Sequence, residues 1–338
     1  MIPLLTPQQA LRPTAIALGS FDGLHQGHRR VIAAVTESAS GPDPDPAHAV
    51  PTVVSFWPHP REVLYGETRL RLDLPAEKLA LLEPLGIRQL VLVPFTRALA
   101  ALSPEEFVRE VLVEELQARS IAVGENFRFG CGRSGAAADL ARLGAACGID
   151  VRVLPMLWDG PERVSSSRIR RALAAGEIGE VRRLLERPYR FCGRVVRGRG
   201  LGRELGWPTA NLQVNGRKCL PLEGVYAALA WCDGGGEAPM EAVMNLGPQP
   251  TVDPAAPSAV EVHLINRRLE LEGARLTVEP LQLLRRQCRF PDLEALVAQI
   301  GADAEEALRL CKASSADGIG MGKAPADEQA DASQQQNP

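Results

Sequence analysis

The sequence predicts two domains of different fold class: an N-terminal α/β domain built on a parallel sheet, and a C-terminal, mainly antiparallel β-barrel or sandwich with a terminal helix. The chain has 338 residues, enough for about two domains at roughly 100–200 residues each. Up to about residue 186, apolar runs alternate with helical patterns, which is typical of a parallel sheet covered by helices. Beyond that point, short runs rich in Gly, Pro and Val favour antiparallel strands.

In the N-terminal half, five apolar runs are expected to be strands, with helices between them. Because ligands gather at the carboxyl ends of parallel strands, the loops after these strands are the expected place for a site. The clearest helix start is Ser103, which precedes Pro104 at the first helical position. The expected strands are residues 15–18, 52–56, 89–93, 120–124 and 151–155, and the expected helices are 29–37, 76–85 and 103–117.

In the C-terminal half, five runs are expected to be strands before a single helix at 292–310, whose apolar residues repeat on one face. Residues 186–190 have the composition of a linker. Residues 313–338 and the Pro/Asp-rich segment 41–46 are too polar to offset the entropy of ordering, so we expect a disordered tail and a loop. The expected domains are therefore 1–186 and 187–312. The expected strands are residues 191–196, 224–231, 241–246, 259–265 and 274–280.

Composition excludes several classes of function. Lys and Arg number 38 against 41 Asp and Glu, a net charge of −3, so no bulk basic field attracts nucleic acid or an anionic membrane. No stretch approaches 18 uncharged apolar residues, and residues 1–13 lack the pattern of a leader, so we expect neither a membrane span nor a secretory signal. The seven cysteines are scattered and never spaced CxxC, which favours cytoplasmic thiols over disulfides or structural zinc.

A glycine-rich turn from Gly19 to His28 follows the first expected strand. Glycines let a backbone turn tightly and approach a ligand. His25 and His28 are three residues apart, so on a helix they share one face. In the first turn of a helix, their N–H donors and the helix N-terminus would converge on one point, which suits a phosphate gaining charge in a transition state. The pair alone is weak evidence, because two histidines without a catalytic role fit the same spacing.

A second segment, residues 165–170, combines hydroxyls with arginines. The serines are suited to capping a helix start, and Arg168 and Arg170 carry forked donors that match triphosphate oxygens. A capped helix with a solvated basic turn fits the same residues.

A third segment, residues 193–211, is rich in glycine. Gly198, Gly202 and Gly206 indicate a flexible arch whose backbone amides meet phosphate. Thr209 and Asn211 supply hard oxygens of the kind that Mg²⁺ takes together with substrate phosphates. As a pattern only, a glycine-rich hairpin is a weak signal.

Together these segments resemble a known family. Residues 19–28 read Gly-x-Phe-Asp-Gly-x-His-x-Gly-His, which is similar to the HxGH nucleotidyltransferases and, more narrowly, to the FMN adenylyltransferase half of the bacterial bifunctional riboflavin kinase/FAD synthetases. Residues 193–211, ending in Pro-Thr-Ala-Asn, resemble the riboflavin kinase signature of that family. The resemblance covers about residues 14–311, and further matches follow in family order at 56–60, 124–130, 133–135, 165–173, 224–227, 242–251 and 261–264.

The resemblance implies a Rossmann-like HxGH nucleotidyltransferase domain followed by a riboflavin kinase barrel. The implied activities are ATP-dependent phosphorylation of riboflavin to FMN, then adenylylation of FMN by ATP to FAD with release of pyrophosphate. Mg²⁺ is the implied cofactor, and ATP, riboflavin, FMN and FAD are the implied substrates and products. The expected protein is a cytoplasmic monomer or weak homo-oligomer with no nucleic-acid or membrane partner.

The resemblance also implies roles for individual residues. His25, His28 and Arg168 would act on the phosphates of ATP during adenylylation. Glu261 would take the proton of the ribityl 5′-hydroxyl in the kinase reaction, with Thr209 and Asn211 holding Mg²⁺. The implied ATP- and flavin-binding residues are Gly19, Phe21, Asp22, Gly23, Asn126, Arg128, Ser165, Ser166, Ser167 and Arg170 in the N-terminal domain, and Gly198, Gly202, Gly206, Pro208, Thr209, Asn211 and Asn245 in the C-terminal domain.

The chain departs from the family pattern at three places. Ala136 stands where Asp is frequent in the family, and we expect this to alter helix capping or ATP-side contacts. Residues 41–50 look like an insertion, and residues 266–273 lack the family's usual acidic, aromatic stretch. Two alternatives therefore stay open. One is an HxGH adenylyltransferase for another phosphate monoester, such as phosphopantetheine or nicotinate mononucleotide. The other is a flavin- or nucleotide-binding protein with an impaired kinase half.

Overall fold

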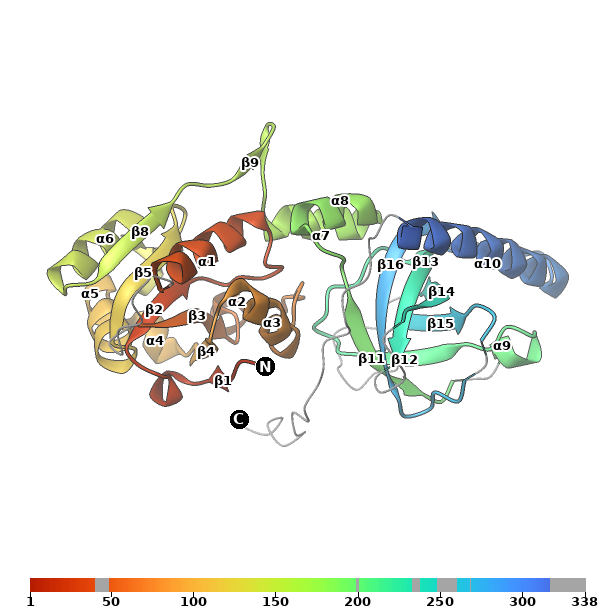
Figure 1. The fold of residues 1–338 in the computed structure, drawn as a ribbon, viewed down its shortest axis with the longest axis horizontal. Helices are drawn as coiled ribbons and strands as arrows, with labels where there is room; N and C mark the ends of the chain where they lie inside the picture. The colour runs from red at the N-terminus through yellow and green to blue at the C-terminus, as the bar shows by residue number, and fades with distance from the viewer. Residues whose placement is uncertain (40–48, 199–200, 233–237, 248–259, 268, 317–338) are drawn as a thin grey trace. The chain divides into compact units, whose positions relative to one another are not determined.

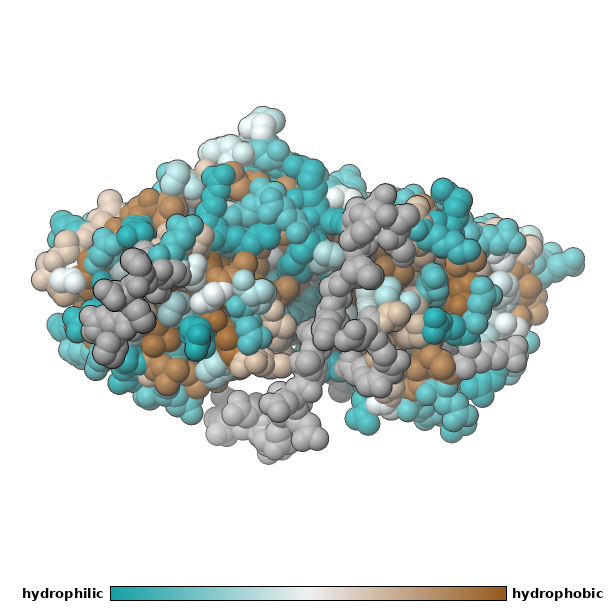
Figure 2. Space-filling model, viewed as in Figure 1, coloured by the Kyte–Doolittle hydropathy of each residue, from teal (hydrophilic) through white to brown (hydrophobic). Residues whose placement is uncertain are grey.

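The computed structural model describes residues 1–39, 49–198, 201–232, 238–247, 260–267 and 269–316. These residues form two units with separate hydrophobic cores (Figure 1). The first unit consists of Met1–Arg171 and Leu184–Glu186, and the second of Ala172–Arg183 and the described residues from Arg187 onward. On the face drawn in Figure 2, hydrophilic residues are interspersed with hydrophobic ones, the ordinary pattern of a water-exposed surface.

The first unit is built on a parallel sheet of six strands in the order β1-β4-β3-β2-β5-β8. The predicted α/β class and the five predicted strands are confirmed; the short β1, which pairs with β4, was not predicted. The chain runs from β2 to one side of the sheet and then crosses to β5 on the other, so the loops after β2 and β5 diverge at a topological switch point. The strands are β1 (Leu4–Leu5), β2 (Thr14–Leu18), β3 (Val50–Trp57), β4 (Gln89–Pro94), β5 (Ala118–Gly124) and β8 (Asp150–Leu154).

Both faces of this sheet are buried. Side chains alternate between the two faces along each strand, and each face packs into its own core cluster. In β2, Ile16 and Leu18 belong to one core cluster, which includes Leu112 and Leu140, while Ala15 and Ala17 belong to the other, which includes residues of α1. The helical segments of this unit are η1 (Pro7–Gln9), α1 (Gln26–Ala39), α2 (Pro60–Tyr65), α3 (Pro75–Leu82), η2 (Glu83–Leu85), α4 (Arg97–Ala101), α5 (Pro104–Phe107), η3 (Val108–Glu115), η4 (Cys131–Arg133) and α6 (Ala137–Ala146).

The predicted helix at 103–117 is confirmed at its start but differs in its interior. Ser103 Oγ accepts the backbone N–H of Glu106 at 3.1 Å, as expected of a cap. After α5 the segment continues as the π-helical η3. The residues that η3 buries, Val108, Val111 and Leu112, are spaced as in an α-helix, so periodicity could not reveal the wider turn.

The second unit is a closed antiparallel barrel in the order β11-β12-β15-β14-β13-β16, with the terminal helix α10 packed on β13, β14 and β16. This confirms the barrel. Strand β12 was not predicted, because it follows directly on the glycine- and proline-rich segment. The elements are β11 (Phe191–Val196), α9 (Leu201–Glu204), β12 (Ala210–Val214), β13 (Gly224–Cys232), β14 (Met240–Leu246), β15 (Val260–Leu264), β16 (Arg275–Arg285) and α10 (Leu293–Ala316).

The remaining elements are two short hairpins, β6 (Arg128–Phe129) with β7 (Gly135–Ala136) and β9 (Trp158–Asp159) with β10 (Glu162–Arg163), and the helices α7 (Ser166–Ala175) and α8 (Ile178–Leu185). Helix α10 extends past the predicted end into the segment expected to be a disordered tail; residues 317–338 of that tail and the predicted loop at 41–46 lie outside the described residues. Within the described part of the chain, no helix is long and apolar enough to cross a membrane.

Candidate active sites

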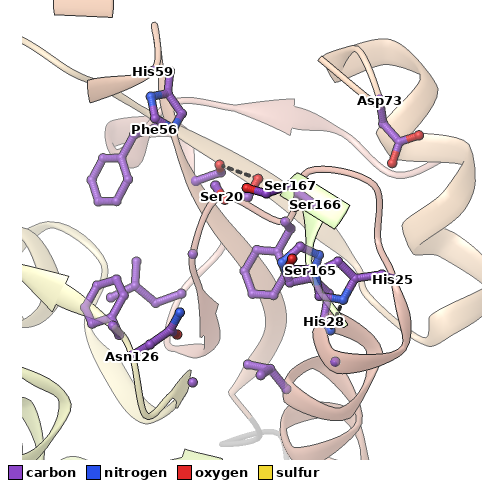
Figure 3. A pocket seen from close by; sticks show the side chains of 18 of the residues that line it. Ser20, His25, His28, Phe56, His59, Asp73, Asn126, Ser165, Ser166 and Ser167 are labelled. Carbon is purple, nitrogen blue, oxygen red and sulfur yellow. Dashed lines mark hydrogen bonds between the residues drawn. The ribbon is translucent and has the colours of Figure 1, made fainter. Parts of the chain in front are cut away.

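The first unit holds a cavity of about 500 Å³ at the carboxyl ends of its parallel strands. Residues at or just beyond the ends of β2, β3 and β5 line it, among them Gly19, Phe56 and Gly124. In Figure 3, His25, His28 and the serines at the start of α7 lie on one side of this cavity, with Phe56 and Asn126 across from them. The cavity therefore lies at the topological switch point, where open α/β sheets bind ligands.

The loop between β2 and α1 is held in an unusual conformation. Phe21, Gly23 and Leu24 have φ values of +44°, +94° and +43°, a region that non-glycine residues rarely occupy. A Cβ at Gly23 would lie 2.7 Å from the Cδ1 atom of Leu72, so glycine is needed at this point. Such conformations persist where the surroundings fix them, and they cluster at binding and catalytic sites.

The two histidines of this loop stack on each other. Their ring centroids are 3.6 Å apart with an interplanar angle of 19°, and Phe21 meets the His28 ring edge-on. His25 immediately precedes α1, and its Nδ1 accepts the backbone N–H of His28 at 3.4 Å. Because Nδ1 is an acceptor, the neutral His25 ring carries its hydrogen on Nε2. Both rings line the cavity, so the structure brings together the predicted pair at a helix start.

Both histidines are neutral near pH 7. Burial, followed by the positive charge of Arg29, lowers the pKa of His25 to about 4. Burial lowers the pKa of His28 well below 6.5, with further contributions from His25 and Lys78. Neutral imidazoles donate N–H hydrogen bonds to phosphate oxygens without themselves carrying charge.

The cavity wall is strongly cationic. Its described lining contains a single carboxylate, Asp73, against seven basic side chains. Such a surplus of fixed positive charge attracts a polyanion, because the protein walls screen charge less than water does. The basic lining residues are Arg61, Arg69, Arg71, Lys78, Arg128, Arg133 and Arg163.

Several of these lining residues had no predicted role. Lys78 is buried, donates to the backbone carbonyl of Ser20 at 3.0 Å, and has its pKa lowered by burial. The Arg71 guanidinium lies 5.1 Å from the ring centroid of Trp57. Burial, followed by the charges of nearby arginines, lowers the pKa of His59 to about 3. The match at 56–60 could have pointed to His59, but Arg71 and Lys78 reach the cavity only through the tertiary fold.

Asn126 and Arg128, both predicted, lie on the cavity wall. The Arg128 guanidinium donates to the backbone carbonyl of Phe127 at 2.9 Å. Phe127 also lines the cavity, as does Phe56, so this side offers aromatic faces beside polar groups. A flat conjugated ring is the kind of ligand that such faces stack upon.

Asp22, for which the resemblance implies ligand binding, is buried and has protein partners. Its Oδ1 accepts the backbone N–H of Leu72 at 2.9 Å, and its Oδ2 forms an ion pair with Arg170. Arg170 also donates to the carbonyl of Leu70, and Ser166 Oγ donates to the carbonyl of Asp22 at 2.7 Å. These contacts tie the histidine loop to the start of α7 and to the segment before α3.

Arg168, predicted to be catalytic, has protein partners as well. Its Nη2 lies 2.8 Å from Asp159 Oδ2, and its Nε lies 3.7 Å from Glu162 Oε2, so the β9–β10 hairpin holds its guanidinium. Among the described residues around the cavity, neither Arg168 nor Arg170 is part of the lining, whereas Ser165, Ser166 and Ser167 are. Ser165 Oγ accepts the backbone N–H of Arg168 at 3.2 Å, which confirms the predicted helix cap.

In the barrel, three predicted residues lie side by side on neighbouring strands. Glu261 of β15 pairs with Asn211 of β12 on one side and with Asn245 of β14 on the other. Residues paired across antiparallel strands face the same way, with Cβ atoms about 5 Å apart. The neighbours Val260 and Val262 are buried whereas Glu261 is half-buried, so this row faces away from the barrel interior. Asn245 Oδ1 accepts from Gln287 at 2.7 Å.

Two glycines of the predicted arch lie against Asn211 of this row and against Thr209 just before β12, while residues 199 and 200 lie outside the described residues. A Cβ at Gly198 would lie 2.0 Å from Asn211 Nδ2, and a Cβ at Gly202 would lie 3.2 Å from Thr209 Oγ1. Gly206 has a φ of +83°. The structure therefore brings the predicted arch, Thr209, Asn211 and Glu261 to one place.

This oxygen set fits Mg²⁺. Thr209 and Asn211 provide a hydroxyl and an amide oxygen, and Mg²⁺ is usually bound by few protein oxygens and completed by substrate phosphates and water. No group of three or more His, Cys, Asp or Glu suited to a metal occurs among the described residues, so a metal held entirely by such residues is not found there.

Two of the sequence departures have local consequences. Ala136 provides no side-chain cap for α6, although Asp139 Oδ2 accepts its backbone N–H at 2.9 Å. This confirms the expected effect on capping. In the stretch 266–273, Asn266 and Gly273 adopt φ values of +55° and +82°, while Glu261 and its cross-strand partners keep their register.

Comparison with known proteins assigns a class to each unit. Residues 7–168 match the family model of FAD synthetase, and residues 185–311 match that of riboflavin kinase. The chain is thus of the class that joins a nucleotidyltransferase domain to a flavokinase barrel. It is 38% identical over 301 residues to the bifunctional riboflavin kinase/FMN adenylyltransferase of Pseudomonas fluorescens, covering 88% of this chain and 93% of that protein.

The Escherichia coli K12 protein of the same name is 35% identical over 290 residues, covering 85% of this chain and 90% of that protein. The chain belongs to the family of bifunctional riboflavin kinase/FMN adenylyltransferases. A crystal structure described as a macrolide-efflux protein from Streptococcus pneumoniae has a TM-score of 0.78 at 26% identity, covering 91% of this chain and 98% of that chain.

Proposed function

We propose that this chain phosphorylates riboflavin to FMN in its barrel and adenylylates FMN to FAD in its α/β unit, using ATP for both reactions. The observation that carries the proposal is the cavity of the first unit, where two neutral, stacked imidazoles stand among seven basic side chains and one carboxylate. Such a wall suits a reaction between two anions, a flavin phosphate and a nucleoside triphosphate. Membership of the family supports the same pair of activities.

In the adenylyl transfer, a phosphate oxygen of FMN bonds to the α-phosphorus of ATP while the bond from that phosphorus to the pyrophosphate oxygen breaks. His25 and His28 donate N–H hydrogen bonds to the α-phosphoryl oxygens, where charge grows in the transition state. The backbone amides at the start of α7, near Ser166 and Ser167, and the basic wall bind the departing pyrophosphate. The aromatic side of the cavity stacks on the isoalloxazine ring.

Arg168 and Arg170 each form an ion pair with a carboxylate of the protein, and these ion pairs determine how each arginine contributes to the site. Arg170 fixes the histidine loop through Asp22. Arg168 reaches a triphosphate only by exchanging Asp159 for a phosphate oxygen, and we propose that it makes this exchange when ATP binds. Both arginines therefore serve the adenylyl transfer from outside the described cavity lining.

In the kinase reaction, Glu261 accepts the proton of the ribityl 5′-hydroxyl as its oxygen bonds to the γ-phosphorus, and ADP departs. The arch of Gly198, Gly202 and Gly206 covers the phosphates with backbone amides. Thr209 and Asn211 would hold Mg²⁺, which would supply neutralisation of charge on the ATP phosphates. Positioning and charge neutralisation supply most of the catalysis in such transfers.

The substrates and the cysteines support a proposal for the cellular location and the partners of the chain. The seven cysteines are scattered along the chain and never spaced CxxC, which favours a reducing compartment. We therefore propose that the chain acts in the cytoplasm on free small molecules, as a monomer or weak homo-oligomer, without nucleic acid or membrane.

The direct test is incubation of the full chain with riboflavin, ATP and Mg²⁺, followed by chromatographic separation of the flavins over time. We expect FMN to appear first and FAD to follow, with pyrophosphate released in step with FAD. Supplied FMN should give FAD without a lag. FAD from FMN but no FMN from riboflavin would instead favour the alternative with an impaired kinase half, and no flavin product from either substrate would refute the proposal.

A further inference from the structure

His263 lies two residues beyond Glu261 on β15. Asn211 pairs with Glu261, and Ala210 pairs with Val262. Continuing this antiparallel register by one residue brings His263 opposite Thr209, just before β12 begins. Because side chains alternate along a strand, His263 and Thr209 face the same side of the barrel as Glu261 and Asn211.

The His263 side chain holds the segment that carries Thr209. Its Nδ1 lies 2.8 Å from the backbone carbonyl oxygen of Pro208. A carbonyl oxygen only accepts, so Nδ1 must carry the hydrogen in this contact. The same ring meets the Trp207 ring edge-on, with centroids 5.2 Å apart at an angle of 71°, a favourable arrangement for aromatic rings.

The other side of this segment rests on the arch. The backbone N–H of Trp207 donates to the carbonyl of Gly202 at 2.7 Å. A Cβ at Gly202 would lie 2.4 Å from the Trp207 carbonyl oxygen, so the two backbones are in close contact. Residues 207–209 are therefore held between the arch and β15, and His263 provides the contact on the β15 side.

We propose that His263 is a positioning residue for phosphoryl transfer. By holding the Pro208 carbonyl, it sets the separation between the Thr209 and Asn211 oxygens, which take magnesium-ATP, and the carboxylate of Glu261. A misplacement of about 1 Å at this point weakens the alignment on which transfer depends. The inference rests on the proposed kinase function and adds to it a residue that acts through Pro208 and does not touch the reacting atoms.

The test uses the full chain with His263→Phe, which keeps a ring against Trp207 but removes the donor, and His263→Asn, whose side-chain amide places a donor where Nδ1 stands. The control is Gln213→Ala, on the same outer face of β12 but paired with Arg194 of β11. Riboflavin phosphorylation is measured at varied Mg²⁺, ATP and riboflavin, and FMN adenylylation is measured beside it as an internal reference.

We expect His263→Phe to lower kcat/KM for magnesium-ATP by about tenfold, as loss of one well-placed hydrogen bond does. The KM for magnesium-ATP and the Mg²⁺ requirement should rise while the KM for riboflavin stays constant. His263→Asn should stay within about threefold of the wild type, and Gln213→Ala should match it, because neither loses the contact to Pro208.

Three results would overturn the inference: full kinase activity in His263→Phe, loss in His263→Asn as deep as in His263→Phe, or a rise in the KM for riboflavin equal to that for magnesium-ATP. The last pattern is that of a general weakening of the barrel. A wild-type chain that makes no FMN from riboflavin would contradict the proposed kinase function itself, so the two failures are distinguishable.

Discussion

Acidification should destabilise the first unit through His25. Burial and Arg29 lower the pKa of this side chain from 6.5 to about 4 in the folded chain. The unfolded chain therefore binds a proton below pH 6.5, while the folded chain stays neutral until about pH 4, so stability falls as the pH drops through this window. With these two pKa values, lowering the pH from 7 to 5 costs about 2 kcal/mol at this one residue, or about twentyfold in the opening equilibrium.

The comparison that isolates this effect is between the wild type and His25→Asn. Asn does not titrate, and its side-chain oxygen can accept the backbone N–H of His28 as an ordinary helix cap. The measurement is hydrogen exchange of the β2 amides in both proteins at pH 7 and pH 5, so that intrinsic exchange rates cancel at each pH. We expect the wild type to lose about twentyfold more protection than the variant on acidification. Equal losses in the two proteins would refute the argument that burial keeps His25 neutral.

Two further predictions concern the kinase arch and the histidine loop. Gly198→Ala should lower riboflavin phosphorylation by at least about tenfold, because its Cβ would lie 2.0 Å from Asn211 Nδ2. The control is Gly179→Ala, whose new methyl has no atom within 4 Å. A kinase assay in which both variants match the wild type would contradict the arch geometry. Asp22→Ala leaves Arg170 without its buried carboxylate partner and should lower the free energy of unfolding of the first unit by about 3–5 kcal/mol. Urea denaturation measures this change. A loss below about 1 kcal/mol would show that the ion pair does not hold the loop.

The fold was largely predictable because the secondary structure of each domain is indicated by short stretches of sequence. Strands of the parallel sheet are apolar on both faces, and Ser103 and Ser165 cap helices as expected from their positions. The strand β12 was missed because its first residues continue a glycine- and proline-rich segment that reads as loop. The π-helical turn of η3 leaves no trace in the spacing of its buried residues.

The candidate sites were only partly predictable. The stacked His25 and His28 are close in sequence, so their spacing already placed them on one helix start. The cations Arg71 and Lys78, in contrast, line the same cavity as the histidines only because tertiary packing brings them there. The ion pair of Arg170 with Asp22 joins residues 148 positions apart, a separation at which one sequence offers no signal for a partner.

The most direct test of two independent sites on one chain compares His28→Ala and Glu261→Gln in the same flavin assay. His28→Ala should convert riboflavin to FMN at the wild-type rate and form almost no FAD, because only the cavity of the first unit has lost a donor. Glu261→Gln should form almost no FMN from riboflavin, yet convert supplied FMN to FAD at the wild-type rate. Failure of Glu261→Gln to convert supplied FMN to FAD, or failure of His28→Ala to form FMN from riboflavin, would contradict the assignment of one reaction to each unit.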